Sequence, residues 1–269
     1  MSQFDDDTAP IPDGPDRWRV TPTAAWNIGD AANGGYALSL VLRAMAADDE
    51  HPDPLTVTTH FLRPLRPDGT DAEIAVETVR RGRSTTVRRS TLRHDGADRI
   101  VVLAAFGRLH ADRIGPSPGA PHIDLPPPSI PMPDACADRR ALEQGVELPI
   151  LDRLDVRIRP DQAVAGGSDR ACVEGWIRFA DGTAPTALSL PLFADAFPPS
   201  LFPLLGGVGW VPTVELTVHV RRHPAAGWVQ ARLECDDLVD GRMVETGSLW
   251  DASGRLVARS RQLGLLLSR

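Results

Sequence analysis

The sequence predicts an α+β fold made of two tandem repeats, in each of which an antiparallel sheet wraps around one helix. Three observations predict it: landmarks that recur at a constant spacing, strand-like alternation in both halves, and a helical segment ahead of each set of strands. The chain has 269 residues, 42% of them hydrophobic, which is enough for one large domain or two of ordinary size with a sizeable core.

The repeat is visible in residues 54–109 and 213–265. Each segment runs through a strand, a turn with proline, a strand, a turn with Gly-Arg, a strand, a turn with glycine and a final strand. The paired landmarks, separated by 158 or 159 residues, are His60 with His219, Gly82 with Gly241, and Gly96 with Gly254. Three matches in the same order are better explained by an internal duplication than by chance.

One helix is predicted ahead of each set of strands. In residues 36–49, which follow Gly34 and Gly35, apolar side chains recur at helical spacing and neither glycine nor proline intervenes. Residues 186–197 hold the matching place in the second half, where Pro191 predicts a helix that begins late or is kinked.

The strands are predicted from period-two alternation of β-branched and polar residues, as in residues 56–61 and 87–92. Hairpin turns are expected at residues 94–97 and 253–255, because glycine supplies the positive φ that such turns need. Short strands ahead of each helix are expected at residues 18–22, 24–28, 155–160 and 174–179.

Two segments are predicted to lie outside the repeats. Residues 1–15, which are acidic and contain prolines, are expected to be a mobile lead-in. Residues 115–148 are expected to be a proline-rich linker, because dense prolines prevent a helix or a central strand. The predicted units are therefore residues 16–114 and 149–269.

Composition excludes several classes of function. All 29 basic residues are arginine, so mechanisms that need a Schiff-base or P-loop lysine are excluded. A net charge of −7 argues against nucleic-acid binding. The start lacks the features of a signal peptide, no apolar run is long enough to span a membrane, and the three cysteines are widely spaced, so we expect a cytoplasmic protein without a disulfide framework or membrane contact.

A helix wrapped by a curved antiparallel sheet is the hotdog arrangement, and two in tandem make a double hotdog. The sequence resembles the acyl-CoA thioesterase II (TesB-like) family of double-hotdog proteins over nearly the whole chain, except the lead-in and the linker. The segments that carry the resemblance are GGYALSLVLRAM, THFLRP and RRGRSTTVRRSTLRHDG in the first half, and FADAF, VELTVHVRR and GRLVARSRQLGLL in the second.

The resemblance implies an active site in the second half. In the family, an Asp, a Thr and a Gln hold the water that attacks the thioester, and the matching residues here are Asp195, Thr213 and Gln262. The chain departs from the family at Glu215 and Leu216, where an Asp-His pair is common. The first half lacks counterparts of the three residues, so one active site per chain is expected.

The chemistry of thioester hydrolysis assigns roles to these residues. Asp195 would accept a proton from the water, helped by a pKa that burial raises, while the Thr213 hydroxyl and the Gln262 amide can each donate and accept. Backbone N–H groups at Asn33, Gly34 and Gly35 are the candidates for binding the developing oxyanion, since they begin a helix. Taken singly, each of the three polar residues could instead be structural, as a helix cap or on the wet face of a strand.

Arginines are the expected partners of the phosphates of CoA, because guanidinium binds phosphate bidentately. The candidates are Arg81, Arg83 and Arg88. The predicted function is therefore hydrolysis of an acyl-CoA, with no metal and no cofactor, in a homodimer or larger homo-oligomer. The alternative is a non-hydrolytic acyl-CoA or acyl-carrier binding protein on the same scaffold; a dehydratase is disfavoured because no histidine lies beside Gly34 or Asp195.

Overall fold

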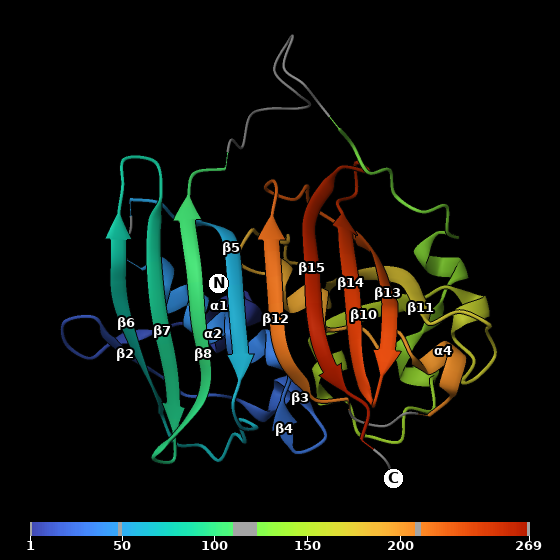
Figure 1. Ribbon diagram of the computed structural model, residues 1–269, viewed down its shortest axis with the longest axis horizontal. Helices are drawn as coiled ribbons and strands as arrows, with labels where there is room; N and C mark the ends of the chain where they lie inside the picture. Colours follow the sequence, from blue (N-terminus) through green and yellow to red (C-terminus); the bar gives the residue numbers. More distant parts are fainter. Residues whose placement is uncertain (1, 48–49, 110–122, 208–210, 268–269) are drawn as a thin grey trace.

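The structure, a computed structural model, describes residues 2–47, 50–109, 123–207 and 211–267. Within these residues, thirteen strands form one continuous antiparallel sheet in the order β1-β2-β6-β7-β8-β5-β12-β15-β14-β13-β11-β10-β9. The helices lie behind this sheet in the view of Figure 1. The predicted α+β double hotdog is thereby confirmed.

Each half of the chain supplies half of the sheet. The strands of the first half are β1 (Ile11–Pro12), β2 (Arg17–Val20), β5 (Asp53–Phe61), β6 (Ala72–Arg81), β7 (Thr86–His94) and β8 (Ala97–Gly107). Those of the second half are β9 (Ala137–Asp138), β10 (Leu154–Ile158), β11 (Cys172–Phe179), β12 (Thr213–Val220), β13 (Val229–Val239), β14 (Arg242–Trp250) and β15 (Leu256–Leu265). A separate pair is formed by β3 (Asn27–Ile28) and β4 (Ala31–Ala32).

The two halves join at β5 and β12, which run side by side in the middle of the sheet (Figure 1). Thr58 of β5 lies directly opposite Thr217 of β12, and their hydroxyl oxygens are 2.9 Å apart. These two residues are 159 positions apart in the chain, which is the spacing of the repeat. Equivalent positions of the two repeats therefore meet across this junction, which relates the halves by an approximate twofold axis.

The helices are α1 (Gln3–Asp7), α2 (Gly34–Ala46), α3 (Leu190–Asp195) and α4 (Phe202–Leu205). The helix predicted at residues 36–49 is α2, which begins two residues earlier; residues 48 and 49 lie outside the described chain. In the second half the helix begins late, at Leu190, as Pro191 predicts, since proline is tolerated in the first turn, where its missing N–H has no helical acceptor.

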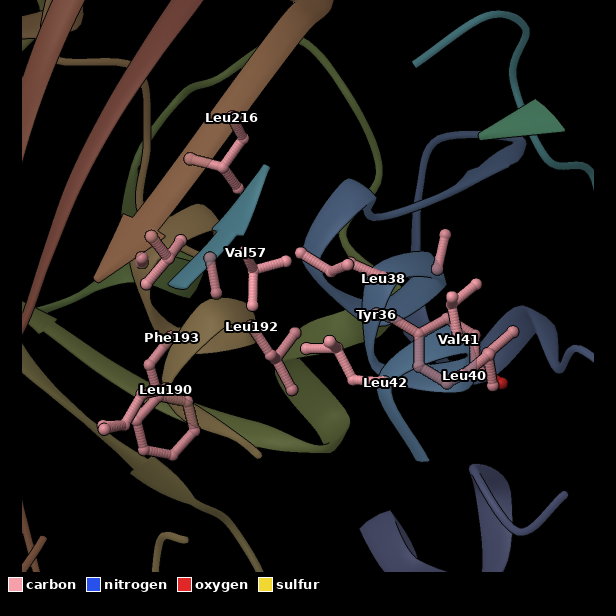
Figure 2. Packing of buried hydrophobic residues seen from close by; sticks show 14 of the residues in the cluster. Tyr36, Leu38, Leu40, Val41, Leu42, Val57, Leu190, Leu192, Phe193 and Leu216 are labelled. Atoms are coloured by element: carbon pink, nitrogen blue, oxygen red, sulfur yellow. The ribbon is translucent and has the colours of Figure 1, made fainter. Parts of the chain in front are cut away.

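The core between sheet and helices is shared by the two halves. Leu38 of α2 and Leu192 of α3 belong to one buried cluster with Val57 of β5 and Leu216 of β12, and Figure 2 shows these side chains gathered between the helices and the strands. Because α2 is buried over most of its length, its apolar side chains stabilise the fold by removing their surface from water. No helix among the described residues is long and apolar enough to cross a membrane.

The start of the chain is packed against both halves instead of forming the predicted mobile lead-in. Phe4 of α1 is buried, with its ring 5.9 Å from that of Trp26 and 5.0 Å from that of Phe179. The Asp7 carboxylate accepts a hydrogen bond from Trp26 and forms an ion pair with Arg153. The single aromatic side chain in an acidic segment holds it to the core, which the composition of the segment did not indicate.

The predicted linker and one predicted strand also differ from the structure. Residues 115–122 of the linker lie outside the described chain, but Ala137–Asp138 form β9 and pair with β10, so the later part of this segment belongs to the second half of the sheet. The segment at residues 24–28 begins as a 3-10 turn (Ala24–Trp26) and only its last two residues are strand. The division into units at residues 16–114 and 149–269 stays a prediction.

Candidate active site

One pocket lies where the start of α2, the end of α3 and the strands β12, β14 and β15 meet. Both halves line it, the first mainly with apolar side chains and the second with further apolar side chains and most of the polar ones. The polar side chains of the second half that line the pocket are Arg139, Gln144, Asp195, Thr213, Glu245 and Gln262. The three residues predicted to hold a water thus line a single pocket, although three different elements carry them.

Asp195, the last residue of α3, is hydrogen-bonded to the start of α2. Its Oδ2 accepts hydrogen bonds from the Gly35 backbone N–H at 2.7 Å and from the Asn33 side-chain Nδ2 at 2.9 Å. Asn33 Nδ2 also donates to the Asp195 backbone carbonyl, while Asn33 Oδ1 caps α2 by accepting from the Tyr36 N–H. No described residue donates to Asp195 Oδ1, so that oxygen remains for a ligand.

Burial raises the pKa of Asp195 to about 6. The hydrogen bonds from Gly35 and Asn33 and the positive charge of Arg139 oppose this rise, because they stabilise the ionised carboxylate. A carboxylate with this pKa is ionised at neutral pH and is more basic than an exposed one, which suits a general base.

Thr213 and Gln262 lie on the neighbouring strands β12 and β15. Thr213 begins β12 opposite Gly264, and a bulge follows it before Glu215. Gln262 lies between Leu216 of β12 and Glu245 of β14 on the helix-facing side of the sheet. Its Nε2 donates to Glu245 Oε1 at 3.1 Å, whereas its Oε1 is buried without a hydrogen-bond partner among the described residues.

Two buried charged residues of the pocket, Glu245 and Arg139, were not predicted from the sequence. Glu245 is only 3% exposed, and burial, with Asp195 and Asp236 as negative neighbours, raises its pKa to about 7. Arg139 is 2% exposed and belongs to the segment predicted to be a linker; burial lowers its pKa to about 9, which the negative charge of Asp195 opposes. The sequence feature that could have revealed Glu245 is its place in an alternating strand: it shares the inward face with the buried Met243 and Gly247.

Of the three backbone N–H groups predicted to bind the oxyanion, the structure leaves one available to a substrate. The Gly35 N–H donates to Asp195 and the Asn33 N–H donates to the carbonyl of Trp26, so neither is available to a substrate. The Gly34 N–H is the one of the three without an acceptor among the described residues. An ideal Cβ on Gly34 would lie 2.9 Å from the ring of Phe61, so a larger residue fits here only if that ring shifts.

The arginines predicted to bind phosphate do not line the pocket. Across the sheet, Arg81 is opposite Thr86 and Thr86 is opposite Phe106, which is itself opposite Pro54 near the start of β5. Phe61, which lines the pocket, is at the other end of β5. At about 3.3 Å per residue these ends of the strand are about 23 Å apart. Arg83 follows in the turn after Arg81 at the same end.

Arg88 is buried and has a structural role in place of the predicted phosphate contact. Its guanidinium donates to the carbonyls of Met45 and Ala47, where α2 ends. A helix end has carbonyls without helical partners, and a cation there is favourable. The exposed arginine that does line the pocket is Arg63, which follows β5.

Comparison with known proteins agrees with this architecture. Residues 22–108 match the model of the acyl-CoA thioesterase N-terminal domain, and residues 133–266 match that of the acyl-CoA thioesterase C-terminal domain. An uncharacterized protein of Mycobacterium tuberculosis is 26% identical over 267 residues, which cover 90% of this chain and 88% of that protein.

Solved structures share the fold over the whole chain. A candidate thioesterase II of Thermobifida fusca is 32% identical, with a TM-score of 0.88 over 100% of this chain and 98% of the other. The acyl-CoA thioesterase II TesB2 of Mycobacterium marinum has a TM-score of 0.74 at 20% identity, with 97% of each chain covered. Together with the matches of both halves to the two thioesterase domains, these likenesses show that the chain belongs to the acyl-CoA thioesterase family and is a TesB-like double-hotdog thioester hydrolase.

Proposed function

We propose that this protein hydrolyses a fatty acyl-CoA, or a related acyl thioester, to the free acid and CoA through a water held by Asp195, Thr213 and Gln262. The observation that carries the proposal is the convergence of these side chains on one pocket, in which Asp195 Oδ1 and Gln262 Oε1 have no partner among the described residues. Two such acceptors match the two protons of a water.

The proposed reaction consumes one water. Its oxygen attacks the thioester carbonyl carbon while a proton passes to Asp195, and the negative charge moves to the carbonyl oxygen. The Gly34 N–H at the start of α2 supports this oxyanion. The C–S bond then breaks as the carbonyl re-forms, and the CoA sulfur receives a proton. Hydrolysis of a thioester needs only water, so the proposal includes no metal and no cofactor.

The pocket lining supports an acyl substrate. Side chains such as Ile28, Leu65, Val146 and Leu265 give the acyl chain an apolar environment. Arg63 is the proposed contact for a phosphate of CoA, because it is exposed and borders the same pocket. A homodimer or larger homo-oligomer stays a prediction.

Release of free thiol from acyl-CoA esters of increasing chain length tests the proposal. We expect saturable turnover that depends on chain length, because longer chains bury more apolar surface in the pocket. Binding of acyl-CoA is measured in parallel, to test the alternative of a non-hydrolytic binding protein. Saturable binding without thiol release would show a non-hydrolytic binding protein on this scaffold.

Asn33→Ala is expected to impair both the site and the helix that supports it. Loss of the amide donor raises the pKa of Asp195, so the acidic limb of hydrolysis moves to higher pH and activity at pH 6.5 falls, by about 10-fold. Loss of the cap on α2 lowers the free energy of unfolding by about 1 kcal/mol.

Thr23→Ala is the matched control for Asn33→Ala, since Thr23 caps a short helix by accepting from the Ala25 N–H and does not line the pocket. A pH profile of thiol release that is the same in Asn33→Ala as in the wild type contradicts the role of Asn33 as a support of Asp195.

A further inference from the structure

We infer that Glu245 is a positioning residue of this site: its carboxylate holds the Gln262 amide so that Gln262 Oε1 faces the pocket and accepts a hydrogen bond from the attacking water. The inference deepens the proposed function and rests on it.

The contacts of Glu245 fit an ionised carboxylate. Oε1 accepts from Gln262 Nε2 at 3.1 Å, and Oε2 accepts from the Ser200 backbone N–H at 3.1 Å. Glu245 and Gln262 are directly opposite each other on β14 and β15, so the sheet holds the two side chains together. Both oxygens of the carboxylate are thus used by donors that the fold places there.

The ionised carboxylate selects one orientation of the amide. If the Gln262 amide were turned over, its Oε1 would face Glu245 Oε1, and two acceptors would be opposed without a proton between them. The observed orientation directs the Gln262 oxygen away from Glu245, where it is buried and without a partner among the described residues. A buried acceptor of this kind is costly unless a ligand or water satisfies it.

This orientation completes the set of groups that a nucleophilic water needs. Asp195 Oδ1 and Gln262 Oε1 accept its two protons, and the Thr213 hydroxyl donates to one lone pair. The second lone pair is then free to attack the carbonyl carbon. With the Gln262 amide turned over, an N–H would meet the water in place of an acceptor, and the water would lose one of the two groups that orient it.

Protonation of Glu245 removes the selection, because a carboxylic acid can donate to Gln262 Oε1 and accept the reversed amide. The titratable groups around Glu245 are Asp195 at the end of α3, Cys235 and Asp236 on β13, and Arg261 on β15, which is paired with Asp236. Asp195 and Asp236 raise the pKa of Glu245 in addition to burial, and Ser200 lowers it. Hydrolysis therefore requires two deprotonations, one of Asp195 and one of Glu245.

Glu245→Gln tests this role with little change in packing. The amide introduced by the substitution can accept from the Ser200 N–H and donate to Gln262 Oε1, which reverses the Gln262 amide. We expect kcat to fall by about 10-fold to 100-fold, the loss typical of a misplaced polar group in a hydrolytic site, with KM changed less than about 2-fold. Below pH 6, log kcat of the wild type should fall with a slope that approaches two, and that of Glu245→Gln with a slope of one.

Glu234→Gln is the matched control, because Glu234 lies on the adjacent strand β13 but its side chain is 40% exposed and paired with Arg170. It should keep the kcat and the pH profile of the wild type. A folded Glu245→Gln variant with wild-type kcat and a two-proton limb overturns the role of Glu245. If that variant does not fold, as judged by circular dichroism, the wild-type profile decides, since a one-proton limb also overturns it.

Failure of the proposed hydrolysis and failure of the Glu245 role give different experimental results. Failure of the proposed function appears as a wild-type protein that binds acyl-CoA without releasing thiol, or as an Asp195→Asn variant with full activity. Failure of the Glu245 role alone leaves Asp195→Asn inactive and Glu245→Gln unchanged.

Discussion

Asp195→Asn is expected to lower kcat for thioester hydrolysis by about 1,000-fold while acyl-CoA binding is retained. The amide oxygen of the variant side chain can still accept from the Gly35 N–H and the Asn33 amide, so the contact between α3 and α2 persists. The oxygen that faces the water is replaced by an NH2 group, which cannot accept a proton. A general base contributes about 100-fold to 10,000-fold to such a reaction, which sets the size of the expected loss.

The same substitution is expected to change how stability depends on pH. The pKa of Asp195 is raised in the folded protein, so the contribution of this group to stability is complete at low pH and is lost as pH rises through about 6. The amide of the variant does not titrate, so the free energy of unfolding of the variant should increase relative to that of the wild type between pH 4 and pH 7.

Urea denaturation and thiol release measured across this pH range test both effects. Asp152→Asn is the control, because Asp152 is an exposed partner of Arg140 away from the pocket. An Asp195→Asn variant that is folded and fully active contradicts the assignment of Asp195 as the base. An unfolded variant contradicts the expected persistence of the contact between α3 and α2.

Gly35→Ala is expected to lower the free energy of unfolding by about 2 kcal/mol and to reduce kcat at the same time. An ideal Cβ at this position would lie 2.7 Å from Leu192 Cα and 3.1 Å from Asp195 Cβ. The nearest atom belongs to backbone, which cannot turn aside as a side chain can. The variant relieves the overlap only if α3 moves away from α2, and Asp195 then moves with it.

The sign of this effect distinguishes packing from helix propensity. Alanine favours a helix over glycine by about 1 kcal/mol, so propensity alone predicts a more stable protein. Gly34→Ala is the informative comparison, because its Cβ would meet the Phe61 ring and the Asp195 carboxylate, which are side chains. It should lose less stability than Gly35→Ala. Thermal or urea unfolding of the two variants decides, and a Gly35→Ala protein as stable as the wild type contradicts the close contact of the helices.

The elements that local pattern governs were predictable from the sequence. Alternation and glycine turns located the long strands, and the landmarks at a constant spacing indicated the duplication that the two halves of the sheet show. The family resemblance placed Asp195, Thr213 and Gln262 in one site, and these three residues line one pocket.

The features that the sequence did not reveal depend on long-range packing. Phe4 is buried by aromatic rings from both halves, which no property of the acidic segment around it anticipates. Arg139 reaches the pocket because β9 joins the edge of the sheet. Arg88 was predicted to bind phosphate because other arginines precede it in the sequence. Its side chain lies on the inner face of β7, where it contacts the end of α2 instead.

The central claim, that a water held by Asp195 attacks the thioester directly, is tested by one single-turnover reaction in H2(18)O with enzyme in excess over acyl-CoA. Direct attack predicts one 18O atom in the carboxylate of the product and none in the protein. If Asp195 attacked the thioester instead, water that opens the resulting anhydride at the aspartyl carbon would leave its 18O on the side chain. Mass spectrometry of the peptide that contains Asp195 reads this out: an unlabelled peptide is the predicted result, and 18O in that peptide contradicts it.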